Sequence, residues 1–153
     1  MSEKEMRALL NELNSRVSEF EDQAPTVLRD CEICVVLVEF GSPSCATVRD
    51  QLAAVTEIAG NHSAFLHSII SHLVVVAFGI TEDAPVARHK DFIAEVLAKF
   101  GLQVKVAYSV GLGHVGLVGG PKRIDFGFIF PAFPKVLAEL SSTPEGKAKG
   151  VYL

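Results

Sequence analysis

Two short apolar runs lie only two residues apart, and this spacing limits how the chain can fold. The runs are residues 65–70 and 73–78, with Ser71 and His72 between them. Both runs are rich in the β-branched and aromatic residues that favour strands. Because so short a connection joins antiparallel neighbours, the sequence predicts a β-hairpin here.

The hairpin lies within an alternation of strands and helices. Residues 33–40 form an uninterrupted apolar run that predicts a buried strand, and apolar residues at helical spacing follow it. The order favours an α+β fold with a ferredoxin-like βαββαβ core, antiparallel strands and core helices on one face. The other expected elements are helices at 44–59, 85–100 and 131–140, and strands at 103–110, 114–118, 124–130 and 151–153.

The first 24 residues predict an amphipathic helix in front of a single domain, residues 31–153. Ser2 followed by Glu5 is a capping box that starts such a helix, and Pro25 ends it. The narrow apolar stripe suits either pairing with a second helix or docking on the domain, and the sequence leaves both open. The stripe comprises Met6, Leu9, Leu10, Leu13, Val17 and Phe20.

Charge and hydropathy exclude two classes of partner. The 153 residues carry a net charge of −4 with scattered lysines and arginines, so we expect no nucleic-acid partner. The sequence starts without a basic leader region, and the apolar run at 73–78 is far shorter than the roughly 20 residues of a membrane span. We therefore expect a cytoplasmic protein without a membrane span.

The cysteines and histidines do not predict a metal site. Three cysteines are an odd number, and the C-x-x-C pair of Cys31 and Cys34 has no second pair to complete a zinc site. We expect the cysteines to be small buried apolar residues. Among the five histidines, His67 and His72, across the hairpin tip, are the one pair that merits a test as ligands.

A literal G-x-G-x-x-G occurs at residues 111–116, directly after a predicted strand. In a dinucleotide-binding site the third glycine opens a helix, whose N-terminus holds the pyrophosphate. Here Gly116 leads to Gly119, Gly120 and Pro121, which do not propagate a helix. The glycines are therefore interpreted as positions of close approach in a β-hairpin.

Residues 110–126 resemble a segment of the class III adenylyl and guanylyl cyclases. The first strand, the helix after it and the hairpin also correspond in order and spacing, so the resemblance covers roughly residues 32–140. It implies a ferredoxin-like core and a domain that forms two-fold dimers. The residues whose type matches the family pattern are Gly111, Gly116, Val118, Gly119, Arg123, Asp125 and Phe126.

The chain departs from this resemblance where the family carries its chemistry. Family members hold two metal ions with an aspartate at the end of the first strand and another in the hairpin, and these positions correspond to Phe40 and His72. Glu39 is adjacent to the first, but neighbouring strand residues point to opposite faces. We therefore expect no metal and no other cofactor.

The remaining family positions have also changed. The base-reading positions correspond to Ser68 and Pro131, and the transition-state positions to Pro134 and Ala138. Residues 147–153 resemble the family's final strand alone, so the C-terminal part is shortened.

These observations predict a degenerate cyclase-homology domain that is not an enzyme. We expect a dimerising or partner-binding signalling module, with a homodimer and an unidentified signalling protein as partners. One alternative is a sensor for a nucleotide or small ligand that uses the vestigial cleft at Phe40, Ser68, His72 and Pro131. Another is a half-site subunit of a heterodimeric cyclase. The candidate interface comprises Leu9, Leu13, Phe128, Phe130 and Phe133.

Overall fold

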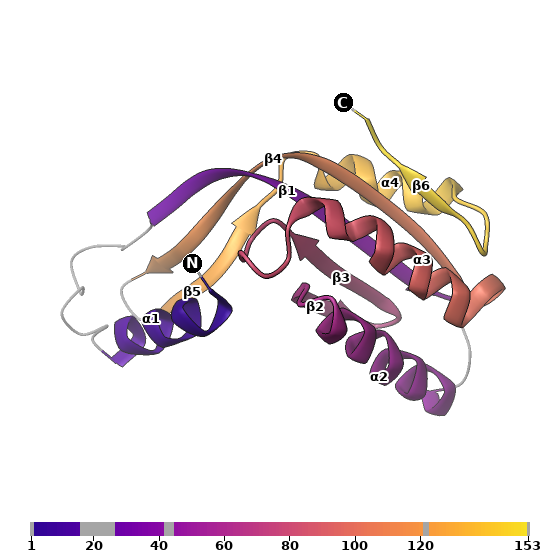
Figure 1. Ribbon diagram of the computed structural model, residues 1–153, viewed down its shortest axis with the longest axis horizontal. Coiled ribbons are helices and arrows are strands. Elements are labelled where there is room, and N and C mark those ends of the chain that lie inside the picture. The colour runs from indigo at the N-terminus through magenta and orange to yellow at the C-terminus, as the bar shows by residue number, and fades with distance from the viewer. Residues whose placement is uncertain (1, 16–26, 42–44, 121–122, 153) are drawn as a thin grey trace.

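The computed structural model describes residues 2–15, 27–41, 45–120 and 123–152, which form a mixed sheet with helices on both faces (Figure 1). The elements in chain order are α1 (Glu3–Ser15), β1 (Val27–Phe40), α2 (Cys45–Asn61), β2 (Phe65–Ile70), β3 (Leu73–Phe78), the 3₁₀ turn η2 (Val86–Arg88), α3 (His89–Phe100), the 3₁₀ turn η3 (Gly101–Gln103), β4 (Val104–Gly120), β5 (Arg123–Ile129), α4 (Phe133–Ser142) and β6 (Ala148–Gly150).

The sheet confirms the predicted ferredoxin-like core. Its strand order is β2-β3-β1-β4-β5, and all of these neighbours are antiparallel. The short β6 adds to β4 in parallel. The six core elements from β1 to β4 follow the βαββαβ order, and the hairpin strands β2 and β3 have the predicted bounds.

Both faces of the central strand β1 are covered, which explains its continuous apolar run. Even-numbered residues such as Val36 and Val38 pack against α2 and α3, whereas odd-numbered residues such as Val35 and Leu37 face the layer that includes α4. The side chains from Ile33 to Val38 are all completely buried.

The region predicted as two strands, 103–110 and 114–118, is a single strand. β4 pairs with β1 without interruption, from Val27 opposite Leu117 to Phe40 opposite Val104. Glycines remain in the ladder where the missing side chain leaves room for a neighbouring one. Gly113 is such a position, because the side chain of Ile33 lies over it. The predicted closing strand at 151–153 is also shifted, because β6 spans 148–150.

Helix α1 begins as predicted and contacts its own domain. The hydroxyl oxygen of Ser2 accepts a hydrogen bond of 3.1 Å from the backbone N–H of Glu5. Met6 is buried within the same apolar cluster as Val115 of β4. The predicted continuation of the helix to residue 24 lies outside the described residues.

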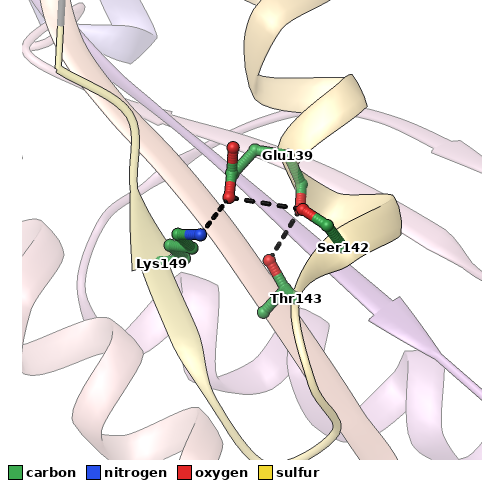
Figure 2. Close-up of polar contacts among 4 residues, drawn as sticks. All are labelled: Glu139, Ser142, Thr143 and Lys149. Atoms are coloured by element: carbon green, nitrogen blue, oxygen red, sulfur yellow. Dashed lines mark hydrogen bonds and ion pairs between the residues drawn. The ribbon is translucent and has the colours of Figure 1, made fainter.

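The C-terminal strand is tied to α4 by a polar cluster (Figure 2). Lys149 Nζ lies 2.6 Å from Glu139 Oε1, and the hydroxyl of Thr143 donates to the backbone carbonyl of Glu139 at 2.8 Å. Ser109 in β4 donates to the carbonyl oxygen of Val151 at 2.8 Å. These bonds hold the last described residues against β4. Among the described residues, none of the helices has the length and apolar character needed to cross a membrane.

Candidate functional site

Phe40 and His72, the two positions at which the sequence resemblance implies metal ligands, are adjacent in space. The backbone N–H of Phe40, at the end of β1, donates a 3.0 Å hydrogen bond to the carbonyl oxygen of His72. His72 occupies the turn between β2 and β3. The fold therefore retains the backbone arrangement that would bring two ligands together.

The side chains at this place do not form a ligand set. The ring of Phe40 is completely buried and packs edge-on against Phe100, with 5.0 Å between ring centroids. Phe40 is thus a core residue beneath α3, and its predicted role in lining a cleft is wrong. The Nδ1 atom of His72 lies 3.1 Å from the hydroxyl oxygen of Ser71.

Glu39 is the carboxylate that precedes Phe40 in the strand, and its side chain points to the opposite face of the sheet. The ladder between β1 and β3 is regular from Cys34 to Glu39, so no bulge turns Glu39 toward the helix layer. Its carboxylate is paired with Lys105, with 3.5 Å between Nζ and Oε1. Within the described residues, no three His, Cys, Asp or Glu side chains gather where a metal ion would fit.

The remaining cleft residues are dispersed. Pro131 follows β5. Ile129 of β5 pairs with His114 of β4, and His114 pairs in turn with Asp30 of β1, so Pro131 lies near the Asp30 end of β1. From Asp30 to Phe40 the strand rises by roughly 33 Å, at about 3.3 Å per residue. Because His72 lies beside Phe40, at the other end of β1, Pro131 and His72 of the same chain are far apart.

The other positions also fail to form a cavity. The hydroxyl of Ser68 lies 3.0 Å from His67 Nδ1, and Pro134 and Ala138 are exposed on α4. Three cavities in the described part of the chain, two under α1 and one between α2 and α3, are lined by other residues.

Most of the predicted interface is occupied within the chain itself. Phe130 is buried, and Phe128 and Phe133 are half-buried against the same apolar cluster. The ring of Phe128 lies 4.7 Å from that of His67, whose pKa is lowered by burial. Leu9 is partly exposed, and the side chain of Leu13 lies outside the described part of the structure. The three phenylalanines therefore pack mainly within their own domain.

A different apolar surface is open to a partner. Paired residues in an antiparallel ladder share a face, and Leu28, Leu112 and Ile129 belong to one face of β1, β4 and β5 through such pairs. Together with Val110 and Val118 they form the distal face, where β1 and β4 extend past α3 (Figure 1). Their exposed fractions are 37% for Leu28, 39% for Val110, 61% for Leu112, 42% for Val118 and 48% for Ile129.

The distal face carries a polar pair at its centre and further charged residues around it, since Glu32 lies opposite Leu112 and Asp125 opposite Val118. His114 Nδ1 lies 2.6 Å from Asp30 Oδ1, and the two residues are directly opposite each other in the ladder. Asp125 is paired with Arg123 on the same face. Exposed apolar side chains rimmed by polar groups are typical of a protein interaction surface. The alternation Val110, Leu112, His114 was visible in the sequence, but dividing the strand at Gly111 concealed it.

The fold is that of nucleotide cyclase catalytic domains, as the sequence resemblance implied. The catalytic core of a rhodopsin-guanylyl cyclase in complex with ATPαS superposes with a TM-score of 0.66 at 12% identity, over 80% of this chain and 79% of that one. The dimeric guanylyl cyclase domain of the RhoGC fusion protein from the aquatic fungus Blastocladiella emersonii gives 0.65 at 12% identity, over 80% of both chains. The adenylyl cyclase CyaB from P. aeruginosa gives 0.56 at 13%, over 80% and 78%. Neither a protein-family model nor a curated protein matches the sequence.

Proposed function

We propose that this chain is a catalytically inactive domain with the cyclase fold, which acts as a dimerising module in signalling. The observation that carries the proposal is the pairing of Phe40 with His72. A backbone hydrogen bond of 3.0 Å joins the two positions that the resemblance assigns to metal ligands, yet neither side chain offers a carboxylate.

The chemistry of phosphoryl transfer explains why the missing carboxylates matter. Mg²⁺ and Mn²⁺ bound to a triphosphate need anionic oxygen ligands from the protein. Glu39 is the nearest carboxylate in sequence, but it faces away from Phe40 and is paired with Lys105. Because this reaction depends on metals and positioned cations, a chain without that ligand set has no means to lower the barrier.

The distal face supports the dimerising role. Five exposed apolar side chains lie on it across three strands, beside the charged residues Asp30, Glu32 and Asp125, and no described helix covers them. A sheet face of this kind is self-complementary in a two-fold dimer, since each apolar residue meets the same surface on the second copy. The dimeric state of the fungal guanylyl cyclase domain shows that a domain with this fold is able to pair.

Enzyme assays test the loss of activity. The purified chain is incubated with ATP or GTP and either Mg²⁺ or Mn²⁺, and we expect no cyclic nucleotide. Formation of cyclic AMP or cyclic GMP would overturn the proposal. Product formed only after a competent cyclase domain with one inactivated half-site is added would support the half-site alternative instead.

Mass in solution tests the interface. We expect the wild-type chain to be a dimer and Leu112→Asp to be a monomer, because the new carboxylate replaces the most exposed apolar side chain of the distal face and adds charge beside Glu32. Ile70→Asp is the matched control, since Ile70 is also a strand residue, with an exposed fraction of 63%, close to the 61% of Leu112. A dimer in Leu112→Asp would show that another surface mediates pairing.

A further inference from the structure

Helix α1 and the sheet enclose two adjacent cavities, which together are called the α1 pocket. The first has a volume of about 220 Å³ and the second about 200 Å³, and Met6 and Phe126 line both. The walls of the first are otherwise mainly apolar, with contributions from Leu9, Val115 and Leu117. Taken together, the cavities reach the lower part of the range of roughly 300–1,000 Å³ that small-molecule sites occupy.

One cation lines the apolar part of this pocket. Arg29 of β1 is directly opposite Val115, so its side chain projects from the sheet face that α1 covers. Among the described residues its guanidinium has no carboxylate partner. The adjacent Asp30 projects from the other face, where it is engaged by His114.

The other described arginines near this end of the sheet are already paired. Arg7 of α1 is 2.7 Å from Glu3, and Arg123 of β5 is 2.9 Å from Asp125. Arg29 therefore supplies the uncompensated positive charge of the pocket. A guanidinium binds a carboxylate through two parallel hydrogen bonds, and apolar walls favour a hydrocarbon tail.

We propose that the α1 pocket binds a small amphipathic carboxylate of the medium-chain fatty acid class. The carboxylate pairs with Arg29, and the tail lies between α1 and the sheet against Met6 and Phe126. Arg7, which lines the second cavity, is paired with Glu3, so Arg29 is the one cation lining the pocket that lacks a carboxylate partner among the described residues, and it matches a monoanion. Because the ligand contacts both α1 and the sheet, its binding stabilises the docked position of the helix.

Calorimetric titration of the full chain with octanoate tests this inference. We expect saturable binding with one site per chain. Octanol, which has the same tail without the charge, binds at least tenfold more weakly, as expected when a charge-assisted hydrogen bond is lost. Equal affinities for octanoate and octanol, or uptake that does not saturate, would overturn the proposal.

Two variants place the site, and one serves as a control. Arg29→Gln weakens octanoate binding about tenfold or more and leaves octanol binding unchanged. Leu9→Trp fills the mouth of the first cavity and weakens the binding of both compounds. Arg49→Gln changes an exposed arginine on α2, away from the pocket, and retains wild-type affinity. Unchanged octanoate binding in Arg29→Gln would show that the guanidinium is not the partner.

Discussion

The side chain of Ile33 in β1 lies directly over the bare Cα of Gly113 in β4. A Cβ atom added at Gly113 would lie 2.6 Å from Ile33 Cδ1 and 3.3 Å from the carbonyl oxygen of Ile129. The central position of the G-x-G-x-x-G stretch thus requires glycine because of packing between strands. The sequence interpretation of close approach is confirmed at this residue.

Gly113→Ala should therefore destabilise the fold by about 1–3 kcal/mol, since the new methyl group overpacks a core contact. Urea unfolding followed by circular dichroism measures the change. Gly127→Ala in β5 is the matched control, because no atom lies within 4 Å of a Cβ built there, and its free energy of unfolding should change little.

A second variant makes the cause specific. Ile33→Val removes the Cδ1 atom that the new methyl group of Gly113→Ala meets. The loss in free energy of unfolding caused by Ile33→Val should therefore be smaller in the Gly113→Ala background than in the wild-type chain. Strictly additive effects would contradict the contact between these two residues.

Protonation of Glu139 should release the C-terminal strand. The hydrogen bond from Lys149 is the main cause that lowers the pKa of Glu139 below its ordinary value of 4.5. A depressed pKa in the folded state stabilises the protein above pH 4.5, and this contribution is lost as the pH falls through the lower, folded value. The amide resonances of Ala148–Gly150 should therefore titrate in one step below pH 4.5.

The matched variants for this titration are Glu139→Gln and Glu145→Gln. The first removes the carboxylate that contacts Lys149, so the step should vanish and the low-pH spectrum should persist at neutral pH. The second changes an exposed glutamate in the adjoining loop and should leave the step in place. A step that survives in Glu139→Gln would mean that another group holds β6.

Local patterns were sufficient to predict the β2–β3 hairpin, and nonlocal pairing explains what they missed. The bounds of β2 and β3 follow from two apolar runs and the short turn at Ser71 and His72, all within fourteen residues. β4 continues through Gly111 because β1 pairs with it from Val104 to Leu117, and a propensity argument at Gly111 does not include that partner.

The candidate site was predicted in outline but not in its details. The resemblance located Phe40 and His72, and the fold brings their backbones together. Phe40 was assigned to a cleft because the resemblance put it at a metal position, and sequence alone does not say which face of a strand lies under helices. For the same reason Phe130 was expected in an interface, although it is buried beside Gly111.

Cys31 and Cys34, the two cysteines whose side chains the structure describes, should differ sharply in reactivity. Burial raises the pKa of Cys34 to about 12, so almost none of it is thiolate at pH 8. Burial also raises the pKa of Cys31, but Arg29 opposes this shift and the residue is only partly buried. Iodoacetamide at pH 8 should modify Cys31 in the folded protein and Cys34 only after unfolding in guanidinium, as peptide mapping by mass spectrometry would report. Rapid native labelling of Cys34 would contradict its place beneath the helices.

A carboxylate introduced at position 40, where the resemblance implies a metal ligand, should unfold the domain rather than create an active site. The side chain of Phe40 is completely buried against Phe100, so Phe40→Asp places an unpaired charge in the core and leaves a cavity where the ring was. We expect a loss of at least about 4 kcal/mol in urea unfolding. His72→Asp is the control, since this residue is in a partly exposed turn and should keep nearly wild-type stability. A stably folded Phe40→Asp that binds Mn²⁺ would show that residue 40 faces an open site, and the assignment of this position to the core would then be wrong.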